Sequence, residues 1–504
     1  MPTPTVLRSA SSTSSSPGKT EQAQEKKKGT TKTGRSNQPH IAIVGAGITG
    51  ATLSIALTRR GIPHAVYEQS PRPAELGAGL GFGPNAARAM RIIDHALWET
   101  FMRVSTPRDA RAPRKGVSIS RRGEGIEGID SEREGEGKPV WIEFLDGTAD
   151  AEGHKLEPVF QVPARYGDGH GAVHRAKWLE VLMGMVPEGV VQFGKRLAGI
   201  EQLEDKVLLK FEDGTTAEAG AVVGCDGVKS KVREVMVGGP DKEGAKCGYS
   251  GKYAYRCMIP MQKAVEEIGS ERAGVSSLWM GYGRHVLTFP VGAPGPDQLL
   301  NLVAFVTDLN QSWTSQDTRS FTLPATREDA IRDFKQGGFG GTVQKLLRLT
   351  KDKMDKWGLF DLADSPLSSF YSGHILVIGD AAHASTPHHG SGAGFCMEDV
   401  AVLASLLDDQ YREAGLSSDA EGLKDVFSVF DASRRERDQW LVLSSRRAAD
   451  LYEWRLPNTG KEHFETMRQD IERRQAICWG ADLDEMVMKA RANLRSRRKR
   501  ATKG

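Results

Sequence analysis

Residues 40–50 read HIAIVGAGITG, in which an apolar run leads into three glycines spaced as Gly45-x-Gly47-x-x-Gly50. This pattern is typical of a buried strand, a tight turn and the start of a helix. The first glycine allows the turn, the second lets an anion approach the backbone, and the third lets the helix pack closely on the strand. Unpaired N–H groups at the start of the helix favour a phosphate group there. The stretch therefore predicts a βαβ unit that binds a dinucleotide.

The residues that follow agree with this prediction. Residues 48–60 predict a helix that ends before Gly61, and residues 64–68 (HAVYE) predict a second strand. That strand ends in Glu68, eighteen residues after Gly50. A carboxylate at this distance suits a ribose diol and repels a 2′-phosphate, so Glu68 is our candidate ligand for the ribose.

Two later segments favour a flavin over a nicotinamide as the bound dinucleotide. Residues 221–227 (AVVGCDG) and 375–394 (ILVIGDAAHASTPHHGSGAG) each predict a strand that ends near an aspartate. Such an aspartate can accept a hydrogen bond from a ribityl hydroxyl, and a glycine-rich loop before a helix can present amides to an anionic ring edge. The candidate FAD-binding residues in these segments are Asp226, Gly227, Asp380, Pro387, Gly392, Ala393 and Gly394.

The charge of the chain is concentrated at its two ends. The 504 residues contain 68 Lys and Arg against 65 Asp and Glu, for a net charge of +3. Residues 1–39 carry +5 and residues 492–504 carry +6, which leaves −8 for residues 40–491. We therefore expect no nucleic-acid partner. Both tails are expected to be disordered, and Arg497–Arg500 is interpreted as a solvated helix end rather than a nuclear signal.

Cysteine usage predicts a protein in a reducing compartment, and hydropathy predicts no membrane-spanning segment. The five cysteines include no CxxC pair, which argues against a zinc site and a disulfide framework. Because the sequence has no apolar run of about 18 residues, no transmembrane helix is expected. The N-terminal tail lacks the amphipathic period of a mitochondrial presequence, so we expect a cytoplasmic protein.

With these motifs identified, the chain resembles the single-component flavoprotein aromatic hydroxylases, the salicylate-hydroxylase-like group that shares the para-hydroxybenzoate-hydroxylase fold. The resemblance covers residues 40–410 and extends weakly to 490. Its most specific feature is the combination of the glycine motif with Cys225-Asp226-Gly227 and with Gly379-Asp380-Ala381-Ala382-His383. The resemblance implies that Gly81 and Arg175 contact FAD. It also implies that two strands, carrying Tyr255-Arg256 and Phe289-Pro290, line an aromatic substrate.

The fold class that we predict is α/β, with a Rossmann-like FAD-binding domain, an inserted β-rich substrate domain and a helical C-terminal region. The predicted boundaries are 40–250 and 357–410 for the FAD-binding domain, 251–356 for the substrate domain and 411–491 for the helical region. Residues 105–138 are rich in Arg, Glu and Gly and are expected to form an exposed insertion.

The resemblance implies an oxidoreductase, specifically a monooxygenase. NADH or NADPH, bound transiently, reduces FAD; the reduced flavin then reacts with O2 to give a C4a-hydroperoxide that hydroxylates a phenolic or aromatic carboxylate substrate. Arg256 is the candidate catalytic residue, because a cation near the ring favours the reactive phenolate. The partners that we expect are this small substrate, O2 and the nicotinamide cofactor, with a homodimer as the one protein assembly considered.

Two alternatives stay open: a related flavoprotein epoxidase or halogenase, and a non-catalytic FAD-binding protein. The family often has a tyrosine where this chain has Phe289 and a glycine where it has Cys257, so the identity and activation of the substrate are open too. No metal is expected, since His383, His388 and His389 lie inside the flavin loop without a neighbouring carboxylate pattern.

Overall fold

The computed structural model describes residues 41–72, 79–107, 140–149, 157–164, 171–310, 313, 321–414 and 420–501. The predictions of a disordered tail at 1–39 and of an exposed insertion, apart from its first residues, lie outside the described residues.

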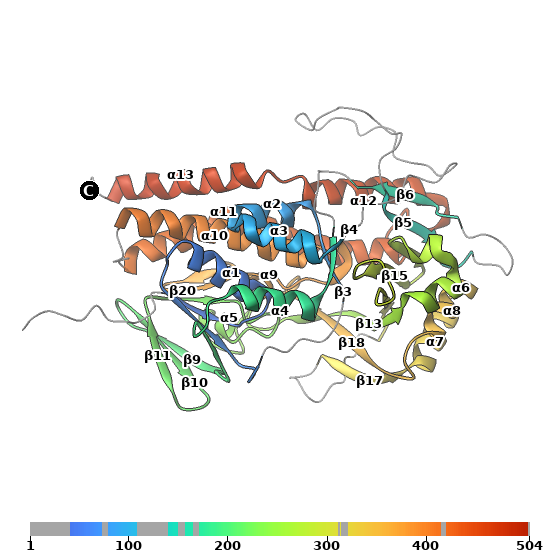
Figure 1. Cartoon of the computed structure of the whole chain (residues 1–504), viewed down its shortest axis with the longest axis horizontal. Helices are drawn as coiled ribbons and strands as arrows, with labels where there is room; N and C mark the ends of the chain where they lie inside the picture. The colour runs from blue at the N-terminus through green and yellow to red at the C-terminus, as the bar shows by residue number, and fades with distance from the viewer. Residues whose placement is uncertain are drawn as a thin grey trace, which may run out of the picture. The chain divides into compact units, whose positions relative to one another are not determined.

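A six-stranded sheet contains the segment that opens the sequence analysis (Figure 1). Its order is β19 (Tyr371–Ser372), β20 (Ile375–Val377), β12 (Ala221–Gly224), β1 (Ile41–Val44), β2 (His64–Glu68) and β8 (Val191–Phe193). All neighbours run parallel except β19 and β20. Every residue of β1, β12 and β20 is buried, as expected for parallel strands covered on both faces. The strand order reverses beside β1, and ligands of such sheets bind at the carboxyl ends of the strands at this point.

Helices from distant parts of the chain pack around this sheet. α1 (Ile48–Arg59) connects β1 to β2 and packs against α4 (Arg175–Met185) and α10 (Gly392–Ala414). α10 also contacts α2 (Pro84–Ile93), which is followed by α3 (His95–Val104). The shorter helices α5 (Lys231–Met236) and α9 (Asp380–His383) follow the ends of β12 and β20.

An eight-stranded sheet forms the second layer of strands. Its order is β17 (Thr322–Thr326), β18 (Lys353–Asp361), β13 (Gly248–Pro260), β16 (Leu299–Thr307), β15 (Arg284–Val291), β14 (Ser277–Gly281), β5 (Val140–Asp146) and β6 (Phe160–Pro163). The helices α6 (Met261–Ala273), α7 (Arg327–Gln336) and α8 (Gly341–Arg348) share a core with it. Because β5 and β6 precede residue 251, this sheet draws on residues from both sides of the predicted domain boundary.

Two small sheets complete the strand structure. One contains β9 (Leu197–Gln202), β10 (Val207–Phe211) and β11 (Thr216–Ala219), and the other contains β3 (Gly79–Phe82), β4 (Thr106–Pro107) and β7 (Gly171–His174). The second small sheet brings the predicted FAD contact Gly81 next to Ala172.

The C-terminal region is helical, with α11 (Ala420–Tyr452), α12 (Phe464–Trp479) and α13 (Leu483–Ala501). Short 3-10 turns form at η1 (Pro387–His389) and η2 (Lys461–His463). The predicted α/β class with its β-rich and C-terminal helical parts is confirmed. Among the helices of the described residues, none combines the length and the hydropathy that spanning a membrane requires.

The expectation of a disordered C-terminal tail is wrong as far as Ala501, because α13 continues through it. Leu494 is fully buried, and Arg495 lies 3.3 Å from a carboxylate oxygen of Asp409 on α10. Arg497 donates to Ser428 Oγ at 2.7 Å. The buried Leu494 and the polar partners of Arg495 and Arg497 thus order a segment for which composition alone predicts a basic tail.

Candidate active site

One cavity of about 1620 Å³ collects most of the residues that the sequence analysis singles out. It exceeds the roughly 300–1,000 Å³ typical of a site for one small ligand, so it has room for a cofactor and a substrate together. The predicted residues that line it are Gly45, Gly47, Glu68, Gly81, Arg175, Asp226, Gly227, Arg256, Asp380, Pro387, Gly392 and Ala393. Gly50 and Gly394 are not among the lining residues.

The glycine loop after β1 has the shape that a bound pyrophosphate needs. A Cβ on Gly50 would lie 1.9 Å from the carbonyl oxygen of Gly45, so Gly50 is required for packing. Gly45 has φ +98°, and a Cβ there would lie 2.6 Å from the carbonyl oxygen of Cys225. A Cβ on Gly47, by contrast, would meet nothing within 4 Å. Gly47 is the N-cap residue of α1, so this open space lies in front of the unpaired N–H groups at the start of the helix. This cradle fits the pyrophosphate of FAD.

Glu68 lies at the end of β2, where the sequence places it, and its carboxylate organises the loop. Oε2 accepts the N–H of Ala46 at 2.8 Å, and Oε1 accepts the N–H of Ser70 at 2.7 Å. Each carboxylate oxygen has a second lone pair, so ribose hydroxyls can still donate to Glu68.

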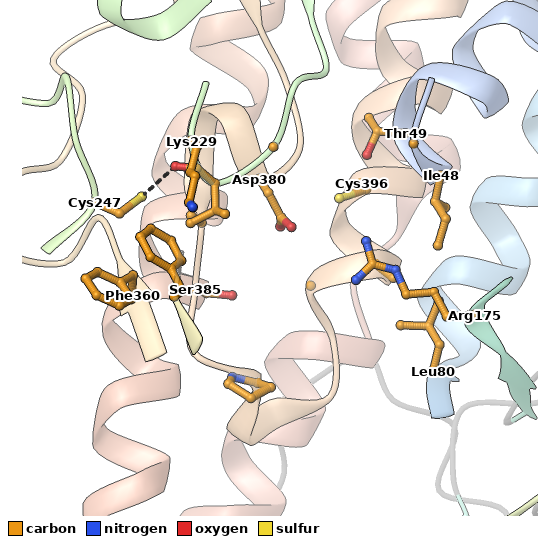
Figure 2. A pocket seen from close by; sticks show the side chains of 18 of the residues that line it. Ile48, Thr49, Leu80, Arg175, Lys229, Cys247, Phe360, Asp380, Ser385 and Cys396 are labelled. Carbon is orange, nitrogen blue, oxygen red and sulfur yellow. Dashed lines mark hydrogen bonds between the residues drawn. The ribbon is translucent and has the colours of Figure 1, made fainter. Parts of the chain in front are cut away.

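The two predicted aspartates lie in different environments. Asp226 is committed to the start of α5, because its carboxylate accepts from Ser230 Oγ at 2.5 Å and from the N–H groups of Lys231 at 2.7 Å and Val232 at 3.0 Å. Asp380 is exposed to the cavity and, among the described residues, has no hydrogen-bond partner for its carboxylate. Figure 2 shows Asp380 between Lys229 on one side and Thr49 on the other. Asp380 is therefore the better placed of the two for a ribityl hydroxyl.

The start of α10 faces the same cavity. Gly392 and Ala393 line it, and a Cβ on Gly392 would meet only Ser385 Oγ, at 3.8 Å. Gly394 turns toward α2, where a Cβ would lie 3.0 Å from Asn85 Nδ2, so this glycine serves packing. The partial positive charge of the helix start suits the anionic edge of a reduced flavin.

A buried cluster of charges lies behind the loop that carries Asp380. Asp399 Oδ2 accepts from the Gly379 N–H at 2.9 Å and pairs with His383 Nε2 at 2.7 Å, while Arg434 Nε donates to Asp399 Oδ1 at 2.8 Å. Burial lowers the pKa of His383, but the nearby carboxylates of Asp438 and Asp399 outweigh it and raise that pKa to about 9. Burial alone would raise the pKa of Asp399, and His383 and Arg434 hold it below its usual range.

His383, Asp399 and Asp438 are also the one group in the described part of the chain whose ligand atoms are close enough to share a metal ion. Arg434 already donates to both carboxylates, at 2.8 Å to Asp399 and 2.5 Å to Asp438. Because the guanidinium supplies the positive charge, we interpret the cluster as a structural ion network rather than a metal site.

Arg256 projects from β13 into the cavity. Its guanidinium carbon lies 5.7 Å from the centre of the Trp357 ring, and no carboxylate among the described residues pairs with it. Burial and the nearby Arg175 lower its pKa to about 10, so it keeps its charge at neutral pH. On the adjacent strand β16, two residues before Val303, which lies opposite Arg256, Asn301 accepts the Gly79 N–H at 3.2 Å and leaves its own buried Nδ2 without a hydrogen-bond partner. The cavity thus offers an unpaired cation and an unused amide donor.

Several lining residues are absent from the sequence-based candidates: Trp141, Ile142, Phe144, Leu278, Leu287, Asn301, His388, Tyr452 and Trp479. They come from β5, β14, β15, β16, η1, α11 and α12, and no motif spacing connects them. Of these residues, only Asn301 could have been recognised in the sequence, since it is a polar residue inside the apolar run LLNLVAFVT of β16.

Comparisons with known proteins agree with this geometry. A family model described as an FAD binding domain matches residues 38–245 and 344–420. An FAD-dependent monooxygenase of Aspergillus niger is 37% identical over 458 residues, which cover 89% of this chain and 95% of that protein. A salicylate hydroxylase of Sarocladium schorii is 36% identical over 467 residues, 90% of each chain. A solved salicylate hydroxylase substrate complex matches with a TM-score of 0.71 and 26% identity, covering 90% of this chain and 98% of that one.

The family model covers the loops after β1, β12 and β20 and the start of α10, which form the predicted FAD side of the cavity, and both relatives match over about nine-tenths of this chain. The predicted oxidoreductase class is confirmed. This chain belongs to the FAD-dependent monooxygenases of the salicylate-hydroxylase type.

Proposed function

We propose that the chain hydroxylates a phenolic or aromatic carboxylate substrate, with NADH or NADPH as the transient reductant and O2 as the oxidant. The observation that carries this proposal is Arg256, a half-buried cation that lines the cavity and has no acidic partner among the described residues. An unpaired charge that is partly removed from water lowers stability, and an anionic ligand beside it would offset part of this loss. A phenolate or an aromatic carboxylate has the required charge and a flat apolar body.

Different residues of this chain bind different parts of FAD. The start of α1 at Gly47 receives the pyrophosphate, and Glu68 and Asp380 accept from the ribose and the ribityl chain. The start of α10 stabilises negative charge on the ring edge. When bound, FAD supplies the redox chemistry, namely the activation of O2 by reducing equivalents from the nicotinamide cofactor.

Three side chains would hold the substrate. Arg256 favours the ionised form of a phenol, which is the more electron-rich and more reactive form. Asn301 Nδ2 can donate to a second oxygen substituent, and Phe289, which is 5% exposed, gives the ring an apolar contact that excludes water.

The test is a panel of salicylates, hydroxybenzoates and larger phenols with the purified, yellow holoenzyme. We expect a subset to stimulate the oxidation of NADH or NADPH and to yield a product that carries one oxygen atom from O2, either with the carboxylate retained or with its release as CO2. A holoenzyme that forms no oxygenated product from any phenol or aromatic acid in the panel would contradict the proposal.

A further inference from the structure

The cavity extends well past Arg256 across the eight-stranded sheet. Its lining passes from β13 to the adjacent strands β16, β15, β14 and β5. These are four steps of about 4.8 Å each, or about 19 Å along the sheet. A single benzene ring covers only a small part of that length.

The far part of this lining is made of large apolar side chains. We call it the apolar arm and define it by Ile142, Phe144, Leu278, Leu287, Tyr452 and Trp479. Ile142 and Phe144 come from β5, Leu278 and Leu287 from β14 and β15, and Tyr452 and Trp479 from α11 and α12. All but Leu287 are 5% exposed or less.

The apolar arm contains no charge. Among the described residues with which this sheet lines the cavity, Arg256 is the one charged side chain and Asn301 the one amide. Burial raises the pKa of the Tyr452 phenol, and burial followed by the nearby His285 lowers the pKa of the neighbouring His388, so both stay neutral at pH 7. The charge that a ligand needs is therefore available only at the Arg256 end.

Space of this kind is uncommon inside a protein, since interiors are close-packed and an empty apolar cavity reduces stability. A ligand with an apolar part would fill it and recover that stability. Together the cation at one end and the uncharged arm at the other describe an elongated molecule with one anionic head.

We propose that the substrate is a phenol or aromatic carboxylate whose ring carries an uncharged apolar extension, such as an alkyl or acyl chain, and that the apolar arm binds this extension. The proposal rests on the proposed function and adds the substrate class to it. The ring and its anionic group lie at Arg256, and the extension points toward β5 and the C-terminal helices.

The test measures dissociation constants of ligands for the holoenzyme from changes in the flavin spectrum. The ligands are salicylate and salicylates with propyl, pentyl and heptyl chains at position 6. Burial of one methylene is worth about 0.8 kcal/mol, so each buried methylene should lower the dissociation constant about fourfold until the arm is full.

The results for this series distinguish a failure of the apolar arm from a failure of the proposed function. If salicylate binds but the dissociation constant stays constant or rises with chain length, the apolar arm has no such role and the proposed function stands. If no member of the series binds although a phenol of the panel above is oxygenated, the assignment of the arm to a chain-bearing salicylate falls; if that panel also gives no oxygenated product, the proposed function itself is contradicted.

A variant that fills the apolar arm tests whether the dependence of the dissociation constant on chain length arises there. Leu287→Trp should weaken heptylsalicylate binding at least tenfold and salicylate binding much less, because Leu287 is half-buried and lies two strands, or about 10 Å, from Arg256 in the cross-strand row Arg256–Val303–Leu287. Leu287→Ala should leave the long chain bound. The control is Leu299→Trp, a half-buried position of the same sheet outside the cavity lining, for which no change is expected. Equal loss for salicylate and heptylsalicylate in Leu287→Trp would overturn the assignment of the arm.

Discussion

His383 Nε2 lies 2.7 Å from Oδ2 of Asp399, and neither side chain is exposed to solvent. The same carboxylate oxygen accepts the N–H of Gly379, the residue before Asp380. The loop that presents Asp380 to the cavity is therefore held from behind by a buried charge on α10. We therefore expect binding of the cofactor to depend on residues that do not line its site.

Replacing the shared carboxylate should loosen that loop. We expect Asp399→Asn to raise the dissociation constant of FAD about tenfold, because hydrogen bonds to charged groups contribute about 1.5–3 kcal/mol each. Reconstitution of the FAD-free protein, followed by flavin fluorescence, measures this. Asp408→Asn is the control on the same helix, since its partner Arg412 is 75% exposed. Equal affinities in both variants would remove Asp399 from the positioning of FAD.

The raised pKa of His383 predicts a loss of stability at alkaline pH. Because the pKa rises from 6.5 to about 9 on folding, its contribution is fully present below pH 6.5 and is lost as the pH rises through 9. The free energy of unfolding by urea, measured from pH 6 to 10, should fall more steeply for the wild type than for His383→Gln. Parallel curves would show that His383 is not protonated in the folded state.

The two aspartates at strand ends should respond differently to the same change. Asp380→Ala should lose FAD occupancy with little change in the melting temperature of the FAD-free protein. Asp226→Ala should lower that melting temperature, because the start of α5 loses three hydrogen bonds; cap losses cost about 0.5–2 kcal/mol. Absorbance of the flavin and thermal unfolding distinguish the two outcomes. A normal FAD content in Asp380→Ala would contradict its assignment.

The glycines of the first loop give a second matched pair. Gly47→Ala should fold normally and bind FAD poorly, since its Cβ would enter open space where the pyrophosphate is expected. Gly50→Ala should fail to fold or be strongly destabilised, because its Cβ would lie 1.9 Å from a carbonyl oxygen. Circular dichroism and FAD titration of each variant make the comparison. Full FAD affinity in Gly47→Ala would show that the pyrophosphate binds elsewhere.

Arg256→Ala should keep FAD and lose turnover by at least a hundredfold, because the cation that favours the phenolate is gone. The measurement is the rate of substrate-dependent NADH or NADPH oxidation, together with the flavin absorbance. Arg332→Ala serves as the control, since Arg332 is 58% exposed and pairs with Asp329 on the surface. Unchanged turnover in Arg256→Ala would exclude it from the reaction.

The nucleotide-binding part of the fold could be predicted from the sequence because its determinants are local. The strand at Ile41–Val44, the helix from Ile48 and the strand ending in Glu68 depend on apolar runs and on glycines a few residues apart. A backbone that must turn sharply or approach an anion accepts few other residues, so these positions can be recognised without any distant contact.

The environments of individual site residues depended on longer-range contacts. Asp226 and Asp380 both follow parallel strands and both line the cavity, yet only the carboxylate of Asp226 is occupied by the N–H groups of a following helix, among the described residues. The helix through Arg497 likewise forms because Asp409 and Ser428 are brought beside it.

The sequence by itself determined where the cofactor-binding loops lie, since glycine spacing and strand-end carboxylates are properties of short segments. Only the tertiary structure decided the shape of the substrate side of the cavity. Arg256, Leu278 and Tyr452 are far apart in the chain and belong to different strands and helices. Their meeting depends on the pairing of a sheet and the packing of α11 against it, which no local pattern encodes.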